Sequence, residues 1–307
     1  MQINRLDPVA STTARLVGAF GDPGSDLTAA QASVAGRERF AWAPAAAPLP
    51  ATLAAASSAS ARGPAQTAAD PVALAKLAQD VYLDAAAPPA GYRVATNAEL
   101  ARIGVNPAFL AQQADGYSAR AYINGTGKTT QVVIAFRGSV ERGDWVANVR
   151  QAVGLNTDHY KRALEVGRQV AQSGATNVTF TGHSLGGGLA SAAGLAAGSR
   201  TVTFNAAGLS DATINQANAI RNASGRTTPD IRAYFVRGEI LSALQDGGDR
   251  VVGGLIGGYL GSRADAPEAY GTRIQLDAVL PSGKRFWNDN PLDKHGMEWV
   301  LSGLRAR

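Results

Sequence analysis

The chain has 307 residues, no cysteine and a formal net charge of +5. Without cysteine it forms no disulfide bond, and its three scattered histidines do not supply the ligand set of a zinc site, so we expect no metal. It has neither the roughly 18 consecutive apolar residues of a membrane span nor a nucleic-acid-binding motif, so we expect no spanning helix and no nucleic-acid partner. The nearest apolar stretch, residues 251–261, is short and rich in glycine, as in a flexible loop or a packed insertion.

The first 69 residues differ in composition from the rest. Residues 1–40 carry scattered apolar positions, and residues 41–69 are mostly Ala, Pro, Ser and Thr, with Arg62 as the only charge. Such a composition predicts a disordered or loosely attached leader. Its start lacks the basic and apolar regions of a cleaved secretory signal. We therefore expect a leader over 1–69 and a folded domain over 70–307.

The remaining sequence alternates between strand and helix patterns. Asp70 followed by Pro71 predicts a helix start, with Asp as N-cap and Pro in the first turn. A second helix is expected at about 159–172, and a short last one over 297–304. Strands are expected at 119–123, 131–137, 177–181, 201–205, 231–237 and 272–276. This alternation predicts an α/β fold, with a mostly parallel central sheet and helices on both faces.

A serine stands between an apolar strand and a helix. Gly182-His183-Ser184-Leu185-Gly186 follows a β-branched run and precedes an Ala- and Leu-rich stretch that reaches Ala197. In the nucleophile elbow of α/β-hydrolases this turn strains the serine, and small residues let neighbouring backbone pass closely. The N–H groups that follow lie at a helix N-terminus, where they stabilise negative charge. We therefore expect Ser184 to be the nucleophile of an acyl-transfer enzyme.

The histidines and the chain order identify a candidate base. α/β-hydrolases place their triad in the order Ser, acid, His. His159 precedes Ser184, and His183 is its direct neighbour and cannot fold back onto the hydroxyl. His295, in a loop before the last predicted helix, is the remaining candidate.

The acid is less clearly marked. It should follow a core strand at the same edge of the sheet, where its carboxylate orients the imidazole. Glu239 comes directly after the strand predicted at 231–237 and is our choice. Asp249 and Asp246 remain as alternatives.

Several motifs together resemble the class 3 lipase family, and its bacterial phospholipase A1-like members in particular. These are Ala78–Tyr82, Phe136-Arg137-Gly138-Ser139, Asp144-Trp145, the serine elbow, Phe204–Leu209 and Val236–Ser242. The resemblance covers about residues 70–307. It implies that Ser139 and the backbone N–H of Leu185 form the oxyanion hole, and that no cofactor is needed.

The chain departs from this family at two positions. Glu239 stands where the family usually has Asp, and Asn148 stands where fungal members carry an Asp near the oxyanion serine. The segment around Trp145 corresponds to the lid of the fungal members.

The resemblance implies a serine hydrolase that cleaves lipid esters, with phospholipid acyl esters favoured. A neutral-lipid lipase or general carboxylesterase is the alternative, and an inactive binding protein on a hydrolase fold is a third reading. The net charge of +5 fits attraction to anionic phospholipid surfaces. Alternatively, the excess of Arg over Lys reflects only the base composition of the genome. A polar leader without a signal peptide suggests an effector exported by a specialised bacterial secretion system. A secretion chaperone or an immunity protein would then be its partner, whereas a cytoplasmic hydrolase is the alternative.

Overall fold

The computed structural model describes residues 69–139, 157–245 and 267–307. The chain divides into two units, Met1–Ala61 and Arg62–Arg307, and all described residues belong to the second. Several sequence predictions therefore lie outside the described residues. These are the leader up to residue 68, the segment around Trp145 and Asn148, the alternative acids Asp246 and Asp249, and the apolar stretch 251–261.

The described strands form one seven-stranded sheet in which spatial order follows chain order. The first three strands pair antiparallel, and β3 to β7 pair parallel, which confirms the mostly parallel sheet. Six strands fall where the sequence predicts them, whereas β1 has three residues and no buried side chain to reveal it. The strands are β1 (Tyr92–Val94), β2 (Ala119–Asn124), β3 (Gln131–Phe136), β4 (Val178–His183), β5 (Thr201–Phe204), β6 (Ile231–Val236) and β7 (Thr272–Leu276).

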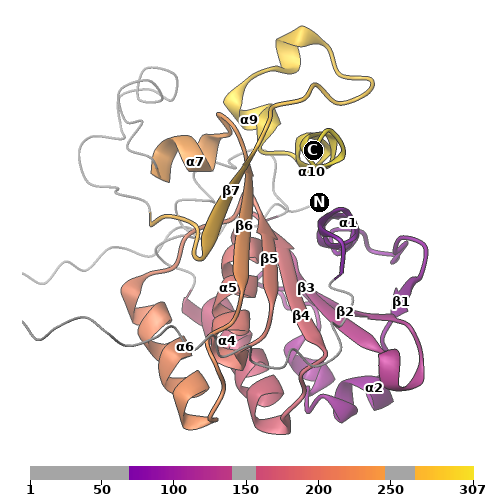
Figure 1. Ribbon diagram of the computed structural model, residues 1–307, viewed down its shortest axis with the longest axis vertical. Coiled ribbons are helices and arrows are strands. Elements are labelled where there is room, and N and C mark those ends of the chain that lie inside the picture. The colour runs from indigo at the N-terminus through magenta and orange to yellow at the C-terminus, as the bar shows by residue number, and fades with distance from the viewer. Residues whose placement is uncertain (1–68, 140–156, 246–266) are drawn as a thin grey trace, which may run out of the picture. The chain divides into compact units, whose positions relative to one another are not determined.

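Three helices cover one face of the sheet: α4 (Thr157–Ser173), α5 (Leu185–Ala197) and α6 (Asp211–Ala223). Each connects neighbouring parallel strands, and because the strand order never reverses, right-handed crossovers bring all three to the same face. Figure 1 shows them side by side. Ile134 and Phe180 from the sheet and Leu189 from α5 are fully buried in the core on this side.

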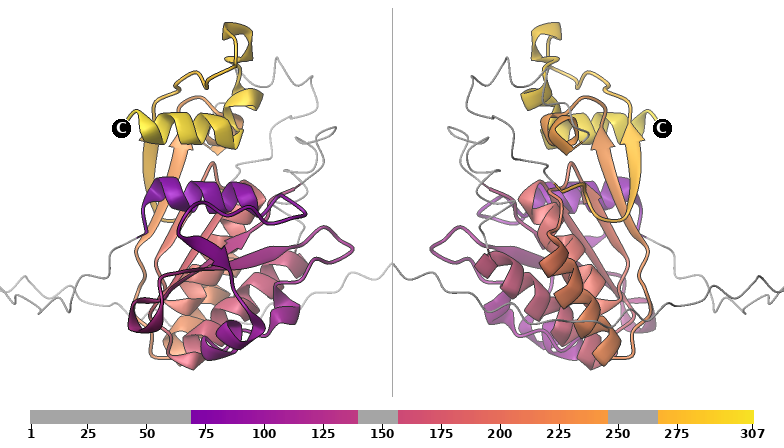
Figure 2. Two further views of the ribbon diagram at one scale, coloured as in Figure 1. Left: turned by 90° about the vertical axis from the view of Figure 1, so that its right-hand side faces the viewer. Right: turned by 90° about the vertical axis from the view of Figure 1, so that its left-hand side faces the viewer.

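The opposite face is covered by the first and last helices, α1 (Pro71–Asp80) and α10 (Met297–Arg305), as Figure 2 shows. The predicted start of α1 is confirmed, since the Asp70 side chain accepts the Val72 N–H. Leu74 of α1 and Trp299 of α10 are buried against this face of the sheet. Both faces are therefore covered, as predicted. No described helix combines the length and the apolar composition needed to cross a membrane.

Shorter elements complete the described part of the chain. They are α2 (Asn97–Arg102), α7 (Ile240–Gln245), α9 (Pro291–Lys294) and the 3-10 helices η1 (Pro107–Phe109), η2 (Gly127–Thr129) and η3 (Phe286–Asn288). The parallel strands β4, β5 and β6 end at one edge of the sheet, so Ser184, Asn205 and Glu239 follow those ends. The fold thus gathers the candidate site at the carboxyl edge.

Candidate active site

Ser184 stands at a strained turn between β4 and α5. Its backbone has φ 59° and ψ −130°, in a region that residues other than glycine rarely adopt. A Cβ on Gly182 would lie 2.2 Å from the carbonyl oxygen of Gly186, and one on Gly186 would lie 2.2 Å from the oxygen of Phe136. Both glycines are therefore sterically required, as predicted from the sequence. The Ser184 hydroxyl is buried and makes no hydrogen bond within the described residues.

Helix α5 begins directly after the serine. The carbonyl oxygen of Ser184 accepts the N–H groups of Gly187 and Ala207, at 2.9 and 3.0 Å, which fixes the turn on two sides. The N–H groups in the first turn of a helix have no partner within the helix, and the helix dipole adds positive charge there. The backbone N–H of Leu185 lies in this first turn.

The segment after β3 packs against the serine turn. A Cβ on Gly138 would lie 2.8 Å from the carbonyl oxygen of His183 and 3.3 Å from the Cβ of Ser184, so only glycine fits. The Gly138 N–H donates to the Tyr82 hydroxyl at 3.1 Å. Gly138, the residue before Ser139, therefore packs against Ser184. Ser139 itself is half-buried.

Glu239 and His295 form a buried pair. Glu239 Oε2 lies 2.7 Å from His295 Nδ1, and the carboxylate also accepts the N–H groups of Leu241 and Ser242 and the Ser242 hydroxyl. Burial raises the pKa of Glu239, but the His295 ring and these donors outweigh it and leave the pKa below its usual value. Because a carboxylate only accepts, His295 carries its proton on Nδ1.

His183 links this pair to the serine turn. Its Nε2 lies 2.8 Å from the carbonyl oxygen of His295, and its Nδ1 lies 3.1 Å from the Tyr82 hydroxyl. A carbonyl only accepts, so Nε2 carries the proton and Nδ1 accepts from Tyr82. Burial, together with the nearby His295, lowers the pKa of His183 to about 3, so the ring is neutral at neutral pH.

Asn205 is a second support for the base loop. Its amide donates to the carbonyl oxygens of His295 and Lys294, at 2.9 and 3.2 Å, and its oxygen accepts the Val236 N–H at 2.9 Å. The residue is buried and has φ 43°, a conformation that Asn tolerates better than most residues. The backbone of His295 is therefore fixed to the ends of β4, β5 and β6.

Sequence reasoning did not find the roles of Tyr82, His183 and Asn205. Tyr82 and Asn205 lie in segments matched only by resemblance, and His183 was considered only as a competing base. A buried carboxylate positions Tyr82 indirectly: Asp80 accepts the Tyr122 hydroxyl at 2.6 Å and pairs with Arg120 at 3.2 Å, which fixes the end of α1 to β2. The polar residues of Ala78–Tyr82 were the available signal.

His159 takes no part in the pair formed by Glu239 and His295. It is buried on α4, with Nε2 3.3 Å from the Asp115 carboxylate and its ring edge-on to Tyr117. The exclusion of His159 on chain order is consistent with this separate environment.

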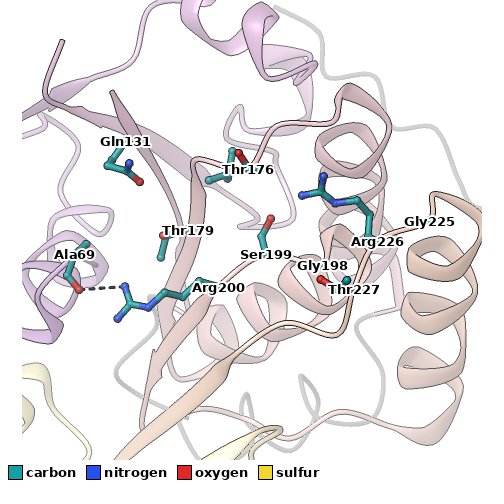
Figure 3. Close-up of a pocket in the computed structure, with 11 residues that line it drawn as sticks. Ala69, Gln131, Thr176, Thr179, Gly198, Ser199, Arg200, Gly225, Arg226 and Thr227 are labelled. Atoms are coloured by element: carbon teal, nitrogen blue, oxygen red, sulfur yellow. Dashed lines mark hydrogen bonds between the residues drawn. The ribbon is translucent and has the colours of Figure 1, made fainter. Parts of the chain in front are cut away.

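A cavity of about 350 Å³ lies at the other end of the strands (Figure 3). Gln131, Thr179 and Arg200 line it, within one residue of the starts of β3, β4 and β5. Arg200 is tied there by a 3.1 Å hydrogen bond to the carbonyl oxygen of Ala69. Ser184 follows the opposite end of β4, so this cavity is not part of the candidate site.

Comparisons with known proteins identify the family of the chain. The model of a phospholipase-like family, the Tle-like phospholipase domain, matches residues 73–282. The chain is 33% identical over 240 residues to the extracellular phospholipase A1 of Serratia liquefaciens, across 76% of this chain and 69% of that protein. The solved Lip2 lipase of Yarrowia lipolytica is similar over 68% of this chain and 78% of its own, with 14% identity and a TM-score of 0.36. A TM-score that low defines neither fold nor function. The resemblance to bacterial phospholipase A1-like enzymes is confirmed by the first two matches, and the chain belongs to the family of Tle-like phospholipase domains.

Proposed function

We propose that the chain hydrolyses acyl esters of phospholipids, with Ser184 as nucleophile, His295 as general base and Glu239 as the acid of the triad. The observation that carries this proposal is the buried 2.7 Å contact between Glu239 Oε2 and His295 Nδ1. The backbone of His295 is in turn held by His183, the residue before Ser184. With its proton on Nδ1, a neutral His295 has its lone pair on Nε2. That tautomer is the one that takes a proton from serine.

The proposed reaction has two halves. The Ser184 oxygen attacks the ester carbonyl carbon, and its proton passes to His295 Nε2. His295 then protonates the departing lysophospholipid oxygen, which leaves an acyl-serine. A water molecule gives a proton to His295 and attacks the acyl carbon. His295 then passes this proton to the departing Ser184 oxygen, which releases the fatty acid and restores the serine.

The negative charge on the tetrahedral oxygen needs donors that are already in place. The Leu185 N–H in the first turn of α5 supports this role, and so does Ser139, which follows the glycine packed on the elbow. Fixed donors of this kind stabilise the oxyanion without reorganising during the reaction. We assign the oxyanion hole to these two residues.

Product analysis of a defined phospholipid tests the function. A phosphatidylcholine with different acyl chains at sn-1 and sn-2 is incubated with the full chain, and the products are identified by mass spectrometry. We expect free sn-1 fatty acid and the matching lysophospholipid, and neither with Ser184→Ala. Release confined to triglycerides or short esters would instead indicate a neutral-lipid lipase or general esterase.

We also propose that the enzyme is exported and that residues 70–307 form its catalytic domain. The Serratia liquefaciens relative is named as extracellular, which supports export, and the unit boundary after Ala61 together with the start of α1 at Pro71 supports the division. Fractionation of a producing culture tests export, with a cytoplasmic marker as control. Affinity purification from that culture would recover a secretion chaperone or an immunity protein, if the exported enzyme has such a partner.

A further inference from the structure

Large apolar side chains are exposed in one short stretch that follows β7 and reaches into α9. Six are exposed among the described residues, and four of these lie within positions 280–292, which we call the exposed apolar loop. They are Leu280, Phe286, Trp287 and Leu292, with 44, 79, 57 and 53% of their surface exposed. The other two, Leu83 and Val94, lie in separate parts of the chain. Such a concentration of apolar surface marks an interaction site more often than chance exposure.

Ion pairs attach the exposed apolar loop to the fold. Lys284 lies 3.0 Å from Glu298 of α10, and Lys294 of α9 pairs with Asp289. The rings of Phe286 and Trp287 meet edge to face at 5.1 Å and are directed outward. Figures 1 and 2 show the segment between β7 and α9 projecting past α10.

A positive charge accompanies the aromatic pair. The Arg285 guanidinium lies 5.1 Å from the centre of the Trp287 ring, and Arg285 is itself exposed. Tryptophan favours the boundary between lipid headgroups and acyl chains, and a guanidinium binds phosphate oxygens well. The two features together are complementary to a phospholipid surface, with the rings toward the acyl chains and the cation at the phosphates.

The exposed apolar loop is also continuous with the site. Leu292 is three residues before His295, and α9 links the loop to the backbone held by His183 and Asn205. A surface bound by this loop would therefore lie next to the carboxyl edge of the sheet, where Ser184 stands. A phospholipid substrate is dispersed poorly as single molecules, so contact with the bilayer and access to the substrate coincide.

We propose that the exposed apolar loop docks the enzyme on phospholipid bilayers by inserting Phe286 and Trp287 between headgroups, with Arg285 at the phosphates. This inference rests on the proposed function for its choice of lipid as the occupant. Membrane contact is thereby assigned to the exposed apolar loop, which lies beside the site and does not include the residues that carry the chemistry.

Vesicle binding without hydrolysis tests the proposal. The full chain carrying Ser184→Ala is sedimented with phosphatidylcholine vesicles, alone and with Phe286→Ser and Trp287→Ser together. The matched control instead carries Leu83→Ser and Val94→Ser, which remove the two exposed large apolar side chains that lie elsewhere in the described residues. We expect the loop variant to bind vesicles at least about tenfold more weakly, because the free energy of binding scales with the apolar area inserted. The control should bind vesicles as tightly as the chain that carries Ser184→Ala alone.

A second arm uses enzymes that retain Ser184. The loop variant should hydrolyse a short soluble ester at the normal rate but phospholipid vesicles more slowly. Normal vesicle binding by the loop variant would overturn the proposal. If the loop variant lost self-association rather than lipid binding, the occupant would be a second copy of the chain, and the proposal would also be overturned. Because binding is measured without catalysis, docking can stand or fall independently of the phospholipase reaction.

Discussion

The Nε2 of His183 lies 2.8 Å from the backbone carbonyl oxygen of His295, so the residue before the proposed nucleophile holds the loop of the proposed base. Tyr82 extends the contact, because its hydroxyl lies against His183 and also accepts the N–H of Gly138. The elbow, the base loop and the oxyanion segment thus meet at the buried His183 and the half-buried Tyr82. We therefore expect His183 to act as a positioning residue whose effect on catalysis passes through His295.

Removing this support should slow turnover without weakening substrate binding. His183→Leu deletes the donor to His295 but keeps an apolar side chain in the space. Because displacements of about 1 Å in a catalytic group cost up to about 100-fold, we expect kcat to fall by about 10- to 100-fold with KM nearly unchanged.

Steady-state kinetics on a soluble ester measures this effect. His183→Gln, which retains an amide donor, should recover part of kcat, and His159→Leu removes a buried imidazole away from the pair as the control. Equal losses in the His183 and His159 leucine variants would indicate a general packing defect and contradict the positioning role.

The charge of Glu239 should matter more than its length. Glu239→Gln no longer holds the proton on Nδ1 of His295, and loss of the equivalent charge in a serine triad costs about 10⁴ in kcat. Glu239→Asp keeps the charge but is one methylene shorter, so we expect a smaller loss. Measured kcat values should rank wild type, Asp and Gln in that order, and a Gln variant as active as the Asp variant would exclude Glu239 as the acid.

Ser139 should contribute to the oxyanion rather than to substrate binding. Loss of one oxyanion donor costs about 10² to 10³ in kcat. We expect Ser139→Ala to show a loss in this range, with the fold unchanged by circular dichroism. Ser302→Ala, at a half-buried serine on α10, is the control and should have normal activity. An unchanged kcat for Ser139→Ala would remove this residue from the oxyanion hole.

The low pKa of His183 predicts acid sensitivity of the fold. An unfolded histidine titrates near 6.5, whereas His183 in the folded chain titrates near 3, so between these values the unfolded state binds one more proton. The free energy of unfolding should therefore fall as the pH decreases from 6.5. Glu239 also loses its stabilising effect in acid, but only as the pH drops below its ordinary value of 4.5.

Measurements between pH 5 and 6.5 on wild type and a His183 variant test this contribution. Between pH 6.5 and pH 5, uptake of one proton by His183 on unfolding lowers the free energy of unfolding by about 1.5 kcal/mol. In His183→Leu the free energy of unfolding should lack this part of its dependence on pH. Urea unfolding at several pH values measures the difference. Parallel stability curves for wild type and variant would show that His183 does not bind a proton on unfolding in this range.

Local patterns were sufficient to predict most of the fold. The strands β2 to β7 contain continuous or alternating apolar residues bounded by turn residues. The Asp70-Pro71 pair marks the start of α1 without reference to the rest of the chain. The glycines of the elbow could be understood from the sequence because their neighbours in space are also neighbours in the chain. In contrast, β1 is short and exposed, and nothing local distinguishes it from a loop.

The residues of the candidate site also divide into those that local patterns predict and those that they do not. The choice of Glu239 used only chain order and strand position, and the structure places its carboxylate on His295. The contacts of His183 with His295 and of Tyr82 with Gly138 join residues 112 and 56 positions apart. Such pairs depend on how α1, β3, β4 and α9 come together, which no local pattern contains.

We propose Ser184 as the nucleophile and His295 as the base that activates it. Labelling with a fluorophosphonate, followed by peptide mass mapping, tests this claim most directly. We predict one phosphonyl group per chain, attached to Ser184, and labelling at least about 100-fold slower in His295→Ala, because the serine would lack its base. Labelling of another residue, or an unchanged rate in His295→Ala, would contradict the claim.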